Sequence, residues 1–527
     1  MFYIDMTDYR MVYDTGSKLV KCGIADDLGQ ILALKSWKPE VIVSLDGFQR
    51  EWNYKTYWDK LIELTKNTIK SANINPRDIK YISSSSIRPS CVFADENNDA
   101  VYIGASFELR GIDYAEELED EFYELTGKSI YESSGHFPSL LFPPGRYKYF
   151  LEERDNDDRI KYITQYLPQD SWILIKLGGE VHTNRVSAGE SGFYDLETKF
   201  WHPAWNVIFD LPDFFFPLPV LPGEVIGTVS KKYQEELGLN SETELVAGLP
   251  DTQAALLGSG CIENGSIGAV LGTTTPVQMV TDNLIISSEE NTWAGLMAAK
   301  NLFNKYYIEA STGLTGQLLI WAANLFFSDQ NLSLKQKFEE LDNAYKRQDQ
   351  FEVQTTPEQI RISSVYAFLG PSPLASTQMG ITPGLFHFQS PGGVEEITSN
   401  KESFIAAVFD NIQFAIMGNI EFLKEKLEAI DHSISIMGGI TRNPVLLQRF
   451  SDLLGTPITT SRSFETTIQG LLVLCDIAAE KIQSIKDLKE GNQNYYNLKD
   501  IHPREVMKQK LSVRYAEWQR LFKHYRG

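Results

Sequence analysis

"VAGLPDTQAALLGSG", residues 246–260, contains a single carboxylate whose position raises the first question about fold and function. An apolar run ends in a Gly-Leu-Pro turn, a single acid follows at Asp251, and a run of small residues comes next. This order predicts a strand, a turn and a helix, with Asp251 where the helix begins. Asp often caps helices because its carboxylate accepts a bond from an unpaired helical N–H. The stretch alone leaves two interpretations open, a helix cap and a catalytic base.

Strand-like and helix-like stretches alternate on both sides of this motif. Residues 11–37 consist of apolar runs divided by Asp-Thr-Gly-Ser and Asp-Asp-Leu-Gly, which predicts three strands in a meander. Residues 56–72 carry apolar side chains at helical spacing, and residues 78–87 form a short apolar run that predicts a buried strand. This sequence of elements predicts an α/β fold.

A second set of strand signals begins near residue 265. "GSIGAVLGTTTPVQMV", residues 265–280, again has an apolar run, a glycine turn and an apolar run. Gly16 and Gly272 thus lie in similar turns in the two halves of the chain, which suggests two related halves. Only the first copy carries an acid, because Asp14 matches Val270. We predict two domains, residues 1–262 and 263–527, and an amphipathic helix at the C-terminal end.

The overall charge argues against nucleic acid as a partner. The 527 residues carry a net charge of −21, whereas binding to a phosphate backbone needs basic patches. Binding of a nucleotide is still compatible with this charge, since backbone N–H groups can hold phosphate. Four dispersed cysteines, no close histidine pair and no apolar run of 18 residues predict a reduced cytoplasmic protein without zinc or membrane span. Whether the chain forms a homodimer is left open.

Two glycine turns could contact phosphate. In Asp14-Thr15-Gly16-Ser17 the glycine lets the backbone approach a phosphate closely, and the carboxylate of Asp14 could hold Mg²⁺. Gly272-Thr273-Thr274 is the second such turn. The alternative for both is an ordinary hairpin turn, since short Asp/Gly turns are abundant.

Two further glycine segments could contact the rest of a nucleotide. Gly438-Gly439 follows an apolar strand and precedes a helix that Asn443 could cap, so a flat adenine could lie on this backbone. The alternative is a closely packed strand-to-helix turn. Gly316 lies at the start of another helix and could also contact the nucleotide. The alternative is an ordinary helix start, with Trp321 as a core residue. The chain contains neither a Walker A motif nor a dinucleotide fingerprint.

Taken together and in order, these stretches resemble the FGGY carbohydrate kinases, two-domain sugar and polyol kinases of the actin/Hsp70/hexokinase superfamily. The family's Asp-x-Gly-Thr turn, Gly-Asp stretch, Gly-Thr-Ser turn and Gly-Gly-x-x-x-Asn segment correspond to Asp14–Ser17, "GLPDTQAALLGSG", "LGTTTP" and "GGITRN". Its Gly-x-x-x-x-Trp helix and its closing Glu-x-Thr-x-x-Gly helix correspond to "GQLLIW" and "ETTIQG". The resemblance implies two ribonuclease H-like α/β domains with ATP and sugar in a central cleft.

The resemblance also implies roles for individual residues. Asp251 is similar to the family's general base, and Asp14 to its Mg²⁺-associated acid. Arg88 is similar to an arginine that binds substrate hydroxyls, although a surface arginine is the alternative. The implied substrate-binding residues are Arg88, Glu108, Asp251 and Thr252. The implied nucleotide-binding residues are Asp14, Gly16, Ser17, Gly272, Thr273, Thr274, Gly316, Gly438, Gly439 and Asn443.

The chain departs from the family pattern at several places, of which three concern the substrate side or the nucleotide cleft. Ser106 to Arg110 replaces the Trp-x-Asp-x-Arg segment, so that the tryptophan is lost and Glu108 stands for the aspartate. Arg88-Pro89 replaces the Arg-Glu pair of glycerol kinases, which argues against glycerol. "LGPSPLASTQMG", residues 369–380, lacks the arginine of the family's Gly-Glu-Arg loop.

The expected activity is therefore ATP- and Mg²⁺-dependent phosphorylation of a small sugar or polyol, with a ketopentose such as xylulose as the leading acceptor. An autoinducer-2-type (dihydroxypentanedione) kinase is one alternative. A catalytically weak relative that binds sugar and nucleotide as a regulator is another, and the missing arginine loop is its main support. An ATPase or chaperone of the superfamily is a further alternative, but few residues follow the last motif.

Overall fold

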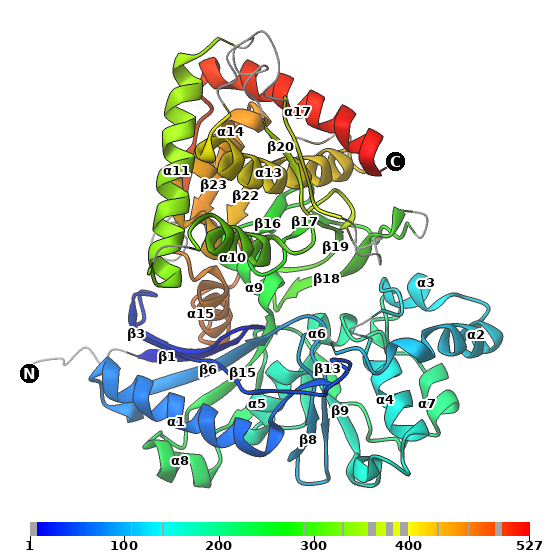
Figure 1. Cartoon of the computed structure of the whole chain (residues 1–527). Helices are drawn as coiled ribbons and strands as arrows, with labels where there is room; N and C mark the ends of the chain where they lie inside the picture. The colour runs from blue at the N-terminus through cyan, green and yellow to red at the C-terminus, as the bar shows by residue number, and fades with distance from the viewer. Residues whose placement is uncertain are drawn as a thin grey trace, which may run out of the picture.

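The computed structural model describes residues 8–106, 108–139, 142–287, 290–328, 331–356, 365–375, 383–389, 399–428, 430, 432–461, 463–490 and 498–526. The chain forms two lobes, one from each half of the sequence, and the lobes lie one above the other in Figure 1. Each lobe is built on one mixed sheet flanked by helices. The predicted α/β class is confirmed.

The N-terminal lobe contains a six-stranded sheet in the order β14-β15-β6-β1-β2-β3. β1, β2 and β3 form the predicted antiparallel meander, and β6 and β15 run parallel to β1. The strands are β1 (Tyr9–Thr15), β2 (Val20–Ala25), β3 (Ile31–Trp37), β6 (Ile79–Ser86), β14 (Val225–Thr228) and β15 (Glu244–Pro250). The helix predicted over residues 56–72 is α1 (Tyr54–Ala72), which packs against β2 and β3.

The C-terminal lobe contains a seven-stranded sheet in the order β18-β19-β17-β16-β22-β23-β24. Its strands are β16 (Ile267–Val270), β17 (Pro276–Thr281), β18 (Trp293–Ala299), β19 (Phe303–Ser311), β22 (Ile434–Met437), β23 (Ile458–Ser461) and β24 (Leu498–Ile501). The run β19-β17-β16-β22-β23 repeats the order and directions of β3-β2-β1-β6-β15. The two halves therefore share one topology. The exact boundary between residues 262 and 263 stays a prediction.

Long helices cover the second sheet. α13 (Lys401–Glu425) packs between α11 (Leu334–Gln354) and the strands β17 and β19. Within the described residues, α13 alone is long and apolar enough to cross a membrane, and 83% of its apolar stretch is buried, as expected of a core helix. The predicted C-terminal amphipathic helix is α17 (Glu505–Arg526). All four cysteines are buried and unpaired, as expected of core residues.

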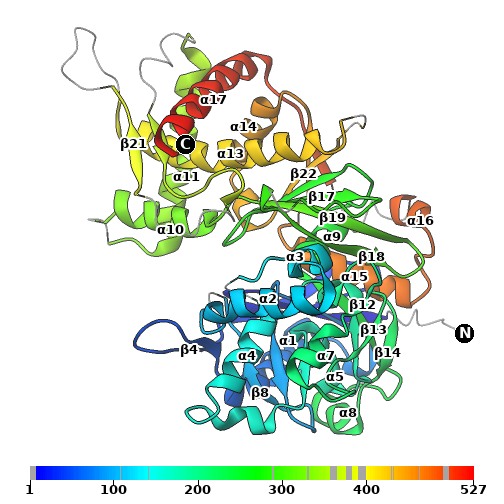
Figure 2. The ribbon, with the colours of Figure 1, turned by 90° about the vertical axis from the view of Figure 1, so that its right-hand side faces the viewer.

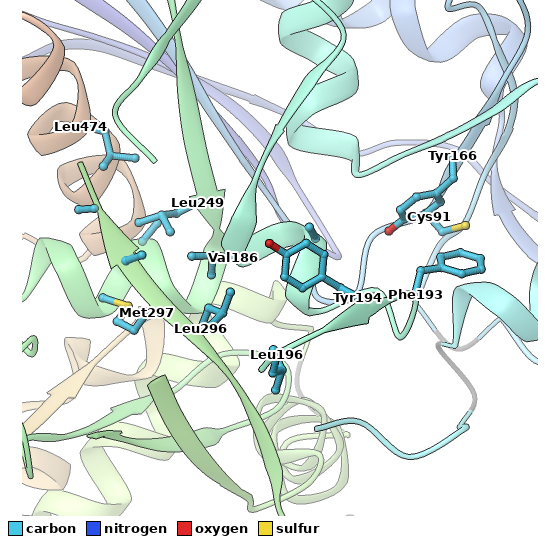
Figure 3. Packing of buried hydrophobic residues seen from close by; sticks show 14 of the residues in the cluster. Cys91, Tyr166, Val186, Phe193, Tyr194, Leu196, Leu249, Leu296, Met297 and Leu474 are labelled. Carbon is cyan, nitrogen blue, oxygen red and sulfur yellow. The ribbon is translucent and has the colours of Figure 1, made fainter. Parts of the chain in front are cut away.

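Two helices cross between the lobes. α9 (Asp251–Gly258) comes from the first half, whereas α15 (Thr466–Ala478) comes from the second half and packs on β1, β6 and β15 of the first lobe. In Figures 1 and 2 α15 lies between the two lobes. Figure 3 shows Leu249 and Leu474 near one another in the buried cluster that continues across this junction.

The crossing requires glycine at both contact points. A Cβ on Gly258 would lie 2.1 Å from the carbonyl oxygen of Thr466, and a Cβ on Gly470 would lie 1.9 Å from that of Ala254. The backbones therefore meet directly, and this contact fixes how α9, and with it Asp251, is held against the second lobe.

Candidate active site

The two predicted phosphate turns face each other across the lobes. Gly16 lies between β1 and β2, and Gly272 lies between β16 and β17. The hydroxyl oxygens of Ser17 and Thr273, which are 256 residues apart in sequence, lie 3.4 Å from each other. Topologically equivalent turns of the two sheets thus meet at one point, as a phosphate site shared by both lobes requires.

A cavity of about 280 Å³ lies beside these turns and has walls from both lobes. It is lined by Ser17, Ile87, Arg88, Ser106, Asp251, Thr252, Val270, Gly272, Thr273, Thr274, Pro276, Trp293, Glu309 and Ser311. The structure therefore brings the predicted base, the predicted arginine and both phosphate turns to one cavity.

Asp251 is the first residue of α9, and Pro250 occupies the N-cap position. The helix-cap interpretation was thus wrong by one residue, although Oδ1 of Asp251 still accepts a bond of 2.7 Å from the Thr252 N–H. Burial raises the pKa of Asp251 to about 6; the guanidinium of Arg88 lowers it and the charge of Asp14 raises it further. A half-buried carboxylate in a cavity, with this pKa, can accept a proton from a bound hydroxyl near neutral pH.

Asp14 is the penultimate residue of β1 and is almost completely buried. It accepts bonds from Ser85 Oγ at 3.3 Å and from Lys21 Nζ at 3.1 Å, and Lys21 also contacts Glu465 of the other half at 2.7 Å. Mg²⁺ in kinases is commonly held by one or two carboxylates together with substrate phosphates, so a single Asp14 fits such a site. No cluster of three or more metal-binding side chains exists within the described parts of the chain.

Arg88 is buried, so the surface-arginine interpretation is wrong. One guanidinium nitrogen lies 2.7 Å from Glu309, which belongs to β19 of the other lobe, and the other lies 3.3 Å from Glu190. Within the described parts of the chain, its Nε has no hydrogen-bond partner. Arg88 is thus fixed at the wall of the cavity by the two carboxylates, and one of its N–H groups is buried and unpaired.

Replacing Arg88 by methionine is expected to cost about 3 kcal/mol or more of unfolding free energy, because Glu190 and Glu309 would be left as buried charges without their cation. Urea unfolding followed by tryptophan fluorescence measures this. Lys60→Met removes an exposed ion pair with Glu63 and should cost no more than about 1 kcal/mol. Equal losses of unfolding free energy in the two variants would contradict the assignment of Arg88 to buried ion pairs with Glu190 and Glu309.

Several residues at the site could not be found from the sequence. Glu190 and Glu309 are isolated acids in their segments, and only the fold brings them to Arg88. Lys21 could have been found from the sequence, because a tight hairpin between the first two strands places it opposite Asp14. No pattern in the sequence indicated Tyr307, whose hydroxyl donates to Glu190 at 2.6 Å.

Glu108 does not reach the cavity, which corrects its prediction as a substrate-binding residue. Its carboxylate is completely buried and accepts bonds from the Arg50 N–H at 2.9 Å and from the Arg110 side chain at 2.8 Å. The neighbouring arginine therefore engages this acid, and Ser106 lines the cavity in its place.

The glycines predicted to hold the nucleotide occupy two different kinds of surroundings, which favour glycine for different reasons. A Cβ on Gly316 would lie 2.4 Å from the Gly272 carbonyl, and Gly438 has φ +99° with a Cβ site 2.5 Å from the Leu271 carbonyl, so packing requires both. A Cβ on Gly439 would meet no atom of the described residues within 4 Å. That open space leaves room for a flat ring against the backbone.

Asn443 caps α14 (Pro444–Leu454), as predicted. Its Oδ1 accepts from the N–H groups of Val445 and Leu446, and its Nδ2 donates to Asp342 at 2.7 Å. One Nδ2 hydrogen is left for a ligand. The core interpretation of Trp321 was wrong, because this side chain, on α10 (Thr315–Phe326), is 42% exposed.

The chain is similar to curated kinases over most of its length. It is 23% identical over 523 residues to the "Putative sugar kinase YoaC" of Bacillus subtilis, covering 98% of this chain and 97% of that protein. It is 28% identical over 283 residues to the autoinducer-2 kinase of Klebsiella pneumoniae, covering about half of each chain.

Solved structures show the same fold at low identity. The xylulose kinase and the gluconate kinase of Lactobacillus acidophilus align with TM-scores of 0.79 and 0.78 at 17% and 18% identity, each covering 98% of both chains. Plasmodium falciparum glycerol kinase with ADP aligns with a TM-score of 0.79 at 16% identity, covering 99% of both chains.

Two family models divide the chain between them. The model for the FGGY family of carbohydrate kinases, N-terminal domain, matches residues 9–258, and the model for the C-terminal domain matches residues 268–479. The chain therefore belongs to the FGGY family of carbohydrate kinases, which are phosphotransferases.

Proposed function

We propose that this sugar kinase transfers the γ-phosphoryl group of ATP, with Mg²⁺, to a hydroxyl of a ketopentose such as xylulose. The observation that carries the proposal is the shared cavity, which Asp251 and Arg88 line together with Ser17 and Thr273 of the two phosphate turns. Phosphoryl transfer requires positioned phosphates and a carboxylate near the acceptor hydroxyl, and this cavity has groups for both. The cytoplasmic location and a homodimer stay predictions.

In the proposed mechanism each residue has a limited task. Arg88 donates hydrogen bonds to acceptor hydroxyls and orients the reacting one toward Asp251, which takes its proton. The backbone N–H groups beside Gly16 and Gly272 and the hydroxyls of Ser17 and Thr273 would contact the transferred phosphate. Mg²⁺, when held beside Asp14, would supply the positive charge that neutralises the phosphates. Closure of the two lobes would exclude water and so limit hydrolysis of ATP.

The test of this function is acceptor-dependent ADP release with Mg-ATP, measured across ketopentoses, pentitols, glycerol, gluconate and dihydroxypentanedione. The proposal expects the highest kcat/KM with a ketopentose. Highest activity with dihydroxypentanedione would instead support the autoinducer-2-type alternative, which the 28% identity over half of the chain favours. Tight nucleotide binding without turnover of any acceptor would support the regulator. Part of the loop that motivates the regulator, residues 376–380, lies outside the described residues.

The activity is expected to depend on the ionisation of Asp251. Its pKa is raised to about 6, and a base is active only when ionised, so kcat/KM should be constant above this pH and fall about tenfold per pH unit below it. Initial rates between about pH 4.5 and 8.5 measure this profile, with ADP binding as the control for intact protein. A flat profile down to about pH 4.5 would show that the titration of Asp251 does not limit the rate.

A further inference from the structure

Arg88 lies between two carboxylates that come from different lobes. Glu190 follows α6 (Arg185–Gly189) in the N-terminal lobe, and Glu309 belongs to β19 in the C-terminal lobe. Their oxygens lie 3.3 and 2.7 Å from the guanidinium. The side chains of all three residues are at least 90% buried, so these charges interact in a region with little water.

Further donors hold both carboxylates in place. The Tyr307 hydroxyl donates to Glu190 at 2.6 Å, and the Gln278 amide donates to Glu309 at 2.6 Å. Burial alone would raise the pKa of Glu190, but Arg88 holds this pKa below its usual value, so Glu190 is ionised. The single positive charge of Arg88 is therefore already balanced before any acceptor arrives.

The part of the cavity around Arg88 and Asp251, where the acceptor would bind, consequently has an excess of negative charge. Among the described residues that line it, Arg88 is the only basic side chain, whereas Asp251 and Glu309 both line it and the buried Glu190 contacts Arg88. Three carboxylates thus lie around the single guanidinium of Arg88, and the ring of His136 lies 3.2 Å from one of them, Glu190. A neutral hydroxylated chain can accept and donate hydrogen bonds in these surroundings, but a carboxylate brought here would meet like charges.

Positive charge lies elsewhere in the cleft. Lys18 and Arg50 line a neighbouring cavity of about 410 Å³, which shares Ser17, Ser106 and Thr273 with the first one. These cations line the neighbouring cavity beside Ser17 and Thr273 of the phosphate turns, and they are not among the residues that line the cavity around Asp251.

We propose that Glu309 is a specificity residue that restricts the acceptor to uncharged polyhydroxy compounds and excludes aldonates. The inference rests on the proposed kinase function and narrows its substrate class. It would also distinguish the acceptors of this chain from the gluconate of the similar structure from Lactobacillus acidophilus. Because Glu309 is supplied by the C-terminal lobe, the discrimination exists only when the lobes are together.

The experiment compares acceptors that differ in charge but have the same hydroxylated chain. Xylitol is paired with xylonate and sorbitol with gluconate, and the full-length protein is assayed with Mg-ATP. In wild type, kcat/KM for the neutral member is expected to exceed that for the aldonate by about 100-fold or more, because juxtaposed like charges are strongly disfavoured in a buried site. Equal use of both members, or preference for the aldonate, would overturn the inference while the kinase function stood.

Glu309→Gln keeps the size of the side chain and removes its charge. This variant should lower the neutral-to-aldonate ratio about tenfold, whereas Glu309→Asp, which keeps the charge, should preserve the ratio even if both KM values rise. Glu339→Gln on α11 changes the net charge equally at an exposed position and should leave the ratio unchanged. An unchanged ratio in Glu309→Gln would overturn the role of Glu309.

The same acceptors are also titrated into wild type without nucleotide by calorimetry. If neither these acceptors nor the ketopentoses are phosphorylated, the proposed function fails, and binding alone then decides the inference. Binding of xylitol but not of xylonate would support the charge discrimination, and equal binding would refute it.

Discussion

Asp251→Asn is expected to lower kcat for sugar phosphorylation about a thousandfold, while the affinity for nucleotide stays within about twofold of wild type. Asparagine keeps the shape of the side chain but cannot take a proton from the acceptor. The phosphate turns belong to other segments and stay intact. Single-turnover kinetics and ADP titration measure the two quantities separately.

The stability of this variant provides the control. The pKa of Asp251 is higher in the folded chain than its usual value, so the ionised side chain destabilises the fold as the pH rises between about 4 and 6. Asparagine avoids this cost. Asp251→Asn should therefore unfold at a higher temperature than wild type at pH 8, and the difference should shrink toward pH 4. Retained turnover would remove Asp251 as the base, and a lower unfolding temperature at pH 8 would contradict the burial argument.

Gly470→Ala is expected to lower the unfolding free energy by about 3 kcal/mol or more. The added Cβ would lie 1.9 Å from the carbonyl oxygen of Ala254, and backbone cannot move away from it as a flexible side chain can. Because α15 and α9 cross here between the lobes, the displacement also shifts Asp251 at the start of α9. Catalytic activity should fall together with stability.

Gly439→Ala is the matched control for this substitution. A Cβ at Gly439 meets no atom within 4 Å, so the unfolding free energy without nucleotide should change by less than about 0.5 kcal/mol. Urea unfolding of both variants beside wild type makes the comparison. Similar losses at Gly470 and Gly439 would show that the helix crossing is less tightly packed than described.

The local signals in the sequence predicted the framework of the molecule well. The alternation of apolar residues and turns in residues 11–37 gave three strands, and the spacing in residues 56–72 gave a helix. The similar turns at Gly16 and Gly272 indicated two related halves, which the shared strand order explains. These features depend on neighbouring residues, and local patterns are what a single sequence records.

The parts of the site that were missed depend on contacts between distant segments. Glu309 follows Arg88 by 221 residues and belongs to the other lobe, so no spacing rule connects the two. Glu108 was assigned to the substrate through its motif, but Arg110, two residues away, binds its carboxylate inside the lobe. The one-residue error at Asp251 has a local cause, since Pro250 takes the N-cap position and moves the acid into the first turn.

The most direct test of the account identifies where the phosphate of ATP goes. Wild type is incubated with Mg-ATP and its best acceptor in water enriched in ¹⁸O, and the products are analysed by mass spectrometry. Transfer to a sugar hydroxyl predicts a phosphorylated acceptor whose phosphate carries no ¹⁸O, formed in equal amount to ADP. Inorganic phosphate containing one ¹⁸O atom, released at the same rate with and without acceptor, would mean that water is the acceptor and would contradict the assignment of this cavity to a sugar.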